Sequence, residues 1–204
     1  MNYGNMKNEQ HCWYHIYNEG IDGGDIFQEK DDFIFFLKRI REVNKPSPDT
    51  VAQRVARHRG VKPKKQAKED ILIKVIAYNL NPNHFHLLIK SENQKNISKF
   101  MQKLSTSYTK YFNHKYKRQG PLFIGRFKIE NIKENMIYDW SIFINLNHTI
   151  HNPADIICSS IDEYVHNQKG LCDSESVSRI IKDKIYPSKP EELDSGIQLL
   201  SKFN

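Results

Sequence analysis

The chain has 204 residues, of which 38% are hydrophobic and 27% charged, a composition that indicates one folded domain, or one domain with an appendage. No apolar run reaches the length of a membrane span, and the N-terminus lacks the basic start and apolar centre of a secretory signal. We therefore predict a cytoplasmic protein with no membrane partner. Three cysteines at unrelated spacings indicate neither a disulfide framework nor a CxxC metal site.

The formal net charge is +7, and the basic residues are concentrated in two blocks. Residues 51–68 and 95–128 contain seven and nine Lys or Arg and no Asp or Glu. A polyanion such as nucleic acid is the natural partner of such blocks. The alternative is a solvated surface with a disordered loop.

The first part of the chain predicts a strand, a helix and an insertion. Residues 11–20 are rich in aromatic side chains and end in glycine, which favours a strand entering a turn. Apolar residues then recur at helical spacing after Asp31, which we expect to cap the helix. About residues 44–70 are polar and basic with three prolines, and they predict an irregular insertion with a short helix at 51–58.

The central part predicts two buried strands, 71–80 and 85–91, and we expect Asn81, Pro82 and Asn83 only to shape the turn between them. A long amphipathic helix at 96–116 follows, then a strand broken by Gly125, a second helix at about 133–146, and a mixed tail from residue 154. This order of elements predicts an α+β fold with helices on one face of a mostly antiparallel sheet.

Two histidines one residue apart interrupt the second of these strands. Alternate side chains of a strand share a face, so His84 and His86 point the same way while Phe85 points into the opposite, buried face. Two imidazoles on one face can bind one cation, although a solvated sheet face is the alternative. A metal site would need further ligands from elsewhere in the fold or from a phosphate.

The stretch "IAYNLNPNHFHLLIK" resembles the His-hydrophobic-His (HUH) motif of the single-tyrosine HUH transposases, in particular the REP-associated tyrosine transposases. The earlier segment "YHIYNEGIDGGDIFQEKDDFIFFL" is similar to the family's opening strand, turn and first helix. The later segments "FMQKLSTSYTKYFNHKYKRQGPLFIGRFK", "FINLNHTIHNP" and "CSSIDEY" are similar to family segments that follow the HUH motif, and the order and spacing also match. The resemblance implies a ferredoxin-like or RRM-like HUH endonuclease domain at 1–153, containing the basic insertion, and a C-terminal extension at 154–204.

The resemblance also implies the chemistry. Such enzymes cut and rejoin single-stranded DNA through a 5′-phosphotyrosine, while a divalent ion polarises the phosphate. His84, His86 and Asn147 would be the metal ligands, with Mg²⁺ or Mn²⁺ as the ion. Single-stranded or hairpin DNA would be the partner. Family members occur as monomers and as homodimers, and a dimer would place the nucleophile helix against the partner's histidines.

The sequence departs from the family at the nucleophile. The family has tyrosine four residues before the amide ligand, whereas this chain has Phe143 four residues before Asn147, and phenylalanine has no oxygen to attack phosphorus. Helical geometry places Tyr138 on another side of that helix, and Tyr108 and Tyr111 fall on the apolar stripe of the long helix. We interpret Phe143 as an engineered Tyr→Phe substitution that prevents cleavage. Natural loss in a domesticated relative, or core packing of Phe143, are the alternatives.

The basic blocks supply the predicted DNA contacts, with surface solvation as the alternative for each residue. These contacts are Arg54, Arg57, Arg59, Lys110, Lys115, Lys117, Arg118, Arg126 and Lys128.

Two other functions remain open from the sequence. A non-catalytic DNA-binding regulator would have kept the fold and lost the chemistry, which Phe143 favours. A metal-dependent hydrolase that activates water would need no tyrosine, and it would cleave DNA without a covalent protein–DNA adduct.

Overall fold

A five-stranded sheet organises the chain in the computed structural model, which describes residues 12–45, 58–60, 71–146, 158–182 and 186–188. The strand order is β4-β1-β3-β2-β5, and every neighbouring pair is antiparallel. The strands are β1 (Cys12–Glu19), β2 (Lys74–Asn81), β3 (His84–Ser91), β4 (Lys128–Ile132) and β5 (Cys158–Ser159). The predicted α+β class with an antiparallel sheet is therefore confirmed.

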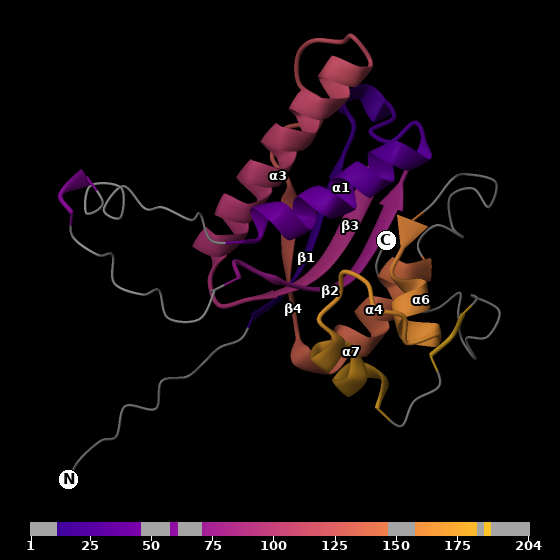
Figure 1. Ribbon diagram of the computed structural model, residues 1–204. Coiled ribbons are helices and arrows are strands. Elements are labelled where there is room, and N and C mark those ends of the chain that lie inside the picture. The colour runs from indigo at the N-terminus through magenta and orange to yellow at the C-terminus, as the bar shows by residue number, and fades with distance from the viewer. Residues whose placement is uncertain (1–11, 46–57, 61–70, 147–157, 183–185, 189–204) are drawn as a thin grey trace.

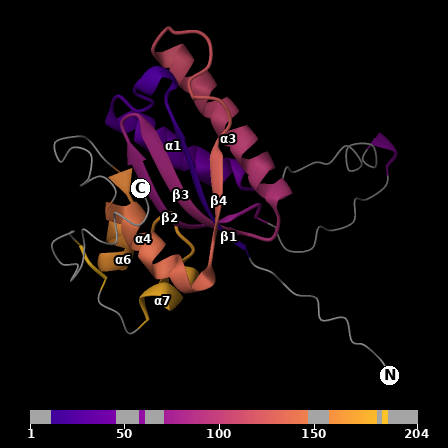
Figure 2. The same ribbon diagram turned by 180° about the vertical axis from the view of Figure 1, so that it is seen from behind.

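Helices cover both faces of this sheet (Figures 1 and 2). Helices α1 (Lys30–Val43) and α3 (Gln94–Lys115) pack on one face, and α4 (Ile137–Leu146), α6 (Ile161–Val165) and α7 (Ser174–Ile181) contribute to the core on the other. Two short 3₁₀ helices, η1 (Ile21–Gly23) and η2 (Glu134–Met136), lie in connections. The prediction of helices on one face only was wrong, because α4 is buried almost all round and carries no polar stripe to reveal its side of the sheet.

The layer of α1 and α3 forms the larger aromatic core. Phe33, Phe36 and Ile40 of α1 meet Phe100, Leu104 and Tyr108 of α3 over the inward side chains of the sheet. The observed bounds of α3 match the predicted long helix closely, because a 22-residue amphipathic pattern with an Asn93 cap is a strong local signal.

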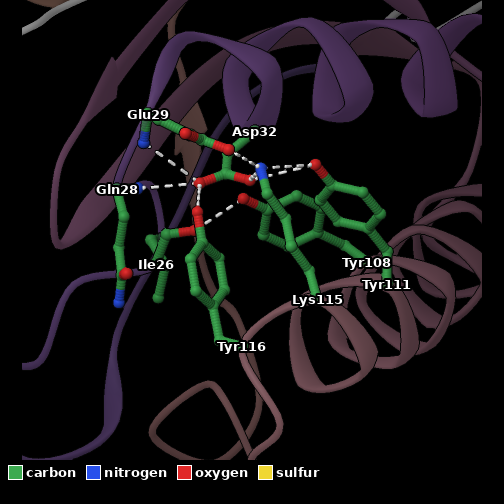
Figure 3. Close-up of polar contacts among 8 residues, drawn as sticks. All are labelled: Ile26, Gln28, Glu29, Asp32, Tyr108, Tyr111, Lys115 and Tyr116. Atoms are coloured by element: carbon green, nitrogen blue, oxygen red, sulfur yellow. Dashed lines mark hydrogen bonds and ion pairs between the residues drawn. The ribbon is translucent and has the colours of Figure 1, made fainter.

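The first turn of α1 is fixed by a buried carboxylate (Figure 3). The backbone N–H groups of Gln28 and Glu29 donate to Asp32 Oδ2 at 2.9 and 3.1 Å. Glu29 is the capping residue and forms a reciprocal capping box with Asp32. The expected cap at Asp31 was therefore wrong, since Asp31 already lies inside the helix.

Asp32 also ties α1 to the end of α3. Lys115 Nζ donates to Asp32 Oδ1 at 2.5 Å, and the hydroxyls of Tyr111 and Tyr116 donate to Asp32 at 3.0 and 2.7 Å. Burial alone raises the pKa of Asp32, but the hydrogen bonds from Lys115, Tyr116 and the two backbone N–H groups hold it below its usual value. Asp32 is therefore a charged carboxylate between two helices, and both of its oxygens accept hydrogen bonds.

The C-terminal segment completes the second core. β5 pairs with β2, and Tyr164, Val177 and Tyr186 share the core of α4. Ser160 Oγ donates to Asn145 Oδ1 at 2.6 Å, and Asn145 Nδ2 donates to the Tyr186 hydroxyl at 2.9 Å. The segment predicted as an extension after residue 153 thus contributes a strand and core side chains to the same fold.

Two predicted features fall largely or wholly outside the described residues. They are the helix at 51–58 and most of the basic insertion. In the part of the chain that the structure describes, no helix combines the length and apolar character needed to cross a membrane.

Candidate functional site

The two histidines lie on the sheet face that α4 covers. Phe85 points to the opposite side, where it is 1% exposed in the core beneath α1 and α3. The rings of His84 and His86 share a face, as predicted, and their centroids are 5.1 Å apart at an interplanar angle of 85°. Both side chains are partly exposed. The hairpin of β2 and β3 thus presents two imidazoles together.

Asparagines around the turn hold the ring of His84. Asn83 Oδ1 lies 2.6 Å from His84 Nδ1, and Asn81 Nδ2 lies 3.0 Å from His84 Nε2. Asn81 also donates to Asn79 Oδ1 at 2.9 Å. The expectation that Asn81 and Asn83 only shape the turn was therefore wrong. After the register shift between Val75 and Ala77, Asn79 pairs with His86 and Asn81 pairs with His84, so both amides of β2 lie on the histidine face.

His86 contacts a third histidine that the sequence interpretation missed. His15 Nε2 lies 2.8 Å from His86 Nδ1, and the two rings stack with centroids 5.1 Å apart. His15 is 4% exposed. This burial lowers the pKa of His15 to about 3, so its imidazole is neutral at pH 7. The alternation of His15 and Tyr17 along β1, like that of His84 and His86, was the available sequence signal.

Tyr17 completes an aromatic surface next to His86. Its ring stacks on His15 at 4.8 Å and on His86 at 5.7 Å between centroids. Burial and the charge of Glu130 raise the pKa of Tyr17 above its ordinary value. Lys128 Nζ lies 5.3 Å from the centroid of the Tyr17 ring and 3.4 Å from Glu19 Oε1. An aromatic ring and a cation therefore adjoin the histidine pair.

Helix α4 places Phe143 against the histidines. The Phe143 ring meets His86 at 6.3 Å and His15 at 6.4 Å between centroids, in both cases edge to face. Trp140, three residues earlier in α4, packs on His15 at 4.7 Å and on Phe143 at 5.5 Å. Phe143 is 4% exposed. These contacts are made within one chain, while the role of Phe143 as nucleophile position stays a prediction.

The other tyrosines considered in the sequence point elsewhere. Tyr138 packs against Tyr186 in the core of α4. Tyr108 is buried and its hydroxyl donates to Ile26 O at 2.5 Å, while the Tyr111 hydroxyl donates to Asp32 (Figure 3). Burial raises the pKa of both Tyr108 and Tyr111. Among these candidates and Tyr17, only Tyr17 has a ring contact with His86.

The predicted third metal ligand, Asn147, lies outside the described residues. Within the described residues there is no group of three or more His, Cys, Asp or Glu side chains that could hold a metal ion. The imidazoles of His84 and His86 fit a divalent ion as two of its ligands. An amide oxygen and phosphate oxygens would have to complete the set.

The predicted DNA contacts fall into separate regions of the molecule. Lys128 extends from β4 on the histidine face, and Arg126 is exposed just before it. The preceding loop is held at the same end of the sheet, because Leu122 O accepts from Ile21 N and Ile124 N donates to Glu19 O, both at 3.0 Å. Lys110 and Lys117 are exposed on α3 and the turn after it. Arg54 and Arg57 lie outside the described residues, and Arg59 is exposed.

Two of these basic side chains have structural partners. Lys115 forms ion pairs with Asp32 and Glu29, each at 2.5 Å (Figure 3). Arg118 donates to Asn113 Oδ1 and to Pro121 O, both at 3.1 Å, and so closes the turn after α3. Their DNA contacts stay predictions, but their charges already stabilise the protein fold.

The geometry defines an α+β protein with paired histidines on an antiparallel sheet. The family model "Transposase IS200 like" matches residues 50–144 of this chain. No curated protein sequence matches the chain. A solved structure of a REP-associated tyrosine transposase bound to a REP hairpin is similar at 14% identity and a TM-score of 0.48, covering 85% of this chain and 89% of that one.

Proposed function

We propose that this chain is an HUH-type tyrosine transposase in which the nucleophile position is occupied by Phe143. Its substrate would be a single-stranded or hairpin DNA end. The transposase family match supports DNA as the partner, and the basic blocks supply charge for its phosphates. We infer that the natural activity is cleavage and rejoining of DNA, and that the present chain binds DNA without cutting it.

His84, His86 and Asn147 would hold a Mg²⁺ or Mn²⁺ ion. When bound, such an ion acts as a Lewis acid on a phosphate oxygen. The protein side chains position the rest of the substrate. Tyr17 offers a ring for base stacking, and Lys128, beside that ring, offers a charge for the neighbouring phosphate. This arrangement would orient the scissile phosphate between the histidines and α4.

The observation that carries the proposal is the contact of Phe143 with His86, at 6.3 Å between ring centroids. Because α4 already brings an aromatic ring to the histidines, tyrosine at this position would carry its hydroxyl into the same site. Its oxygen would form a bond to the 5′ phosphorus as the bond to the 3′ oxygen breaks, leaving a free 3′-hydroxyl. An engineered Tyr→Phe substitution accounts for an intact site without this oxygen, and natural loss is the alternative origin.

The first test restores the hydroxyl. We expect Phe143→Tyr to form a covalent protein–DNA adduct with a cognate single-stranded or hairpin end in Mn²⁺, visible in denaturing electrophoresis. The unchanged chain should bind the same DNA and form no adduct. Adding His86→Ala to Phe143→Tyr should abolish the adduct, because one predicted ligand of the ion would be lost.

A matched control is provided by Tyr17, the other aromatic hydroxyl near the histidines. Phe143→Tyr combined with Tyr17→Phe should still form the adduct, since the bond is made at position 143. Absence of an adduct from Phe143→Tyr on DNA that the protein binds would contradict the transposase proposal. The lack of an oxygen on Phe143 would then favour a DNA-binding regulator, whereas cleavage without an adduct would favour a hydrolase.

A further inference from the structure

His15 lies behind the histidine pair, away from the place where DNA would bind. It is 4% exposed, and α4 covers it through Trp140 and Phe143. Its only side-chain hydrogen bond among the described residues joins Nε2 to His86 Nδ1 at 2.8 Å. Because a buried polar residue costs stability unless it has a partner, this contact calls for a reason beyond packing.

The direction of this hydrogen bond decides which nitrogen of His86 carries a proton. Between two neutral imidazoles, one nitrogen donates and the other accepts. If His15 Nε2 donates, His86 Nδ1 accepts, and the hydrogen of His86 lies on Nε2. If His15 Nε2 accepts, His86 carries its hydrogen on Nδ1, and the electron pair that can bind a metal lies on Nε2.

Glu130 favours the second arrangement. It lies opposite His15 in the pairing of β1 with β4, and its Oε2 is 3.8 Å from His15 Nδ1. A carboxylate at this distance is too far for a hydrogen bond, but its negative charge favours a hydrogen on Nδ1 of His15 over a lone pair there. The neutral ring of His15 then presents a lone pair at Nε2 toward His86.

His84 has the same pattern through a different partner. Asn83 Oδ1, an acceptor, lies 2.6 Å from His84 Nδ1, so His84 carries its hydrogen on Nδ1 as well. Both histidines would then bind an ion through Nε2, and at His84 the ion would replace the hydrogen bond that Asn81 Nδ2 donates to this atom. Histidines that bind metals commonly donate their second N–H to a protein acceptor, and loss of that acceptor typically weakens metal affinity about 10- to 100-fold.

We propose that His15, oriented by Glu130, is a positioning residue that keeps His86 in the tautomer with its electron pair on Nε2. His15 itself would contact neither the ion nor the DNA. This inference deepens the proposed metal site and rests on it for its consequence in function. The tautomer, however, is a property of the metal-free protein and can be measured separately.

The test compares His15→Phe with His15→Gln in the full chain. Phenylalanine keeps a ring for stacking but has no acceptor, whereas the amide oxygen of glutamine lies near the position of imidazole Nε2. In ¹⁵N NMR of the metal-free protein, we expect His86 to show a protonated Nδ1 in the parent and in His15→Gln. In His15→Phe we expect a mixture of tautomers. Glu130 is an exposed side chain, and Glu130→Gln should shift the tautomer ratio of His86 in the same direction but by a smaller amount.

Metal affinity gives the second measurement. His15→Phe should weaken Mn²⁺ binding about 10- to 100-fold in calorimetric titration, and His15→Gln should restore most of it. Trp140→Phe is the matched packing control, because it changes the cover over His15 but leaves the hydrogen bond intact. It should alter neither the tautomer nor the affinity by a comparable amount.

Two results would overturn the inference. One is a parent His86 with its hydrogen on Nε2. The other is an unchanged His86 tautomer in both His15→Phe and Glu130→Gln. If His15→Phe does not fold, Glu130→Gln alone provides the comparison, because Glu130 is exposed. A failure of the proposed function looks different: His86→Ala would leave Mn²⁺ affinity unchanged while the tautomer of the parent remained as expected.

Discussion

At the scale of single residues, His84 and His86 differ in the side chains that surround them. His84 contacts polar turn residues, Asn81 and Asn83. His86 packs among the rings of His15, Tyr17 and Phe143. His86 therefore contributes ring contacts to the packing of this face, whereas His84 has mainly polar contacts. Substitution of the two residues should therefore affect metal binding alike and stability differently.

We expect His84→Ala and His86→Ala each to weaken Mn²⁺ binding sharply, because each removes one of the two proposed imidazole ligands. His84→Ala should leave the free energy of unfolding within about 0.5 kcal/mol, as is usual for changes outside the core. His86→Ala should cost about 1–2 kcal/mol, since it removes ring contacts and the hydrogen bond to buried His15. Calorimetric titration and urea unfolding would measure the two effects, and equal stability losses would contradict the difference in packing.

At the scale of helices and strands, Asp32 links α1 to α3. Asp32 is fully buried and accepts hydrogen bonds from Lys115, Tyr111 and Tyr116 as well as from the backbone (Figure 3). Although burial alone lowers the pKa of Lys115, its bonds to Asp32 and Glu29 raise that pKa above its ordinary value. The pair therefore stays ionised at neutral pH, and removing one partner leaves the other partly buried and uncompensated.

Asp32→Asn should lower the free energy of unfolding at pH 7 by about 3 kcal/mol. The exposed neighbour Asp31→Asn is the matched control, and it should have little effect. Because the pKa of Asp32 is held below its usual value of 3.8 in the folded protein, its stabilisation is full above the unfolded-state pKa. This stabilisation is lost as the pH falls through the folded-state pKa. The stability difference between parent and Asp32→Asn should therefore shrink on acidification, and a difference that grew below pH 4 would contradict this account.

The sequence predicted those elements whose signals are local. The alternation around His84 and His86 placed both side chains on one face, and the amphipathic pattern of residues 96–116 located the long helix. By contrast, the contact of His15 with His86 depends on the pairing of β1 with β3 across 71 residues. The burial of nearly every residue of α4 removed the pattern that would have shown its face of the sheet. Tertiary packing, rather than local preference, set both features.

At the scale of the whole molecule, the predicted DNA contacts lie on different layers. Lys128 is on the histidine face, beside Tyr17, whereas Lys110 is exposed on α3, which covers the opposite face. In the proposed site, a DNA strand beside the histidines would lie next to Tyr17 and Lys128. The same strand would have to extend to the opposite layer to contact Lys110 on α3. The two lysines therefore report on the path of the DNA.

We expect Lys128→Gln to weaken binding of a cognate single-stranded end and to reduce the slope of log affinity against log salt by about 1, because one phosphate contact and its released counterion are lost. Lys110→Gln removes the same charge from the opposite layer and should change the slope by much less. Both side chains are exposed, so neither change should disturb the fold. Fluorescence anisotropy titrations over a range of salt concentrations would measure the slopes. Equal losses would show that the strand contacts both layers, and a larger loss for Lys110→Gln would place the DNA on α3 and away from the histidines.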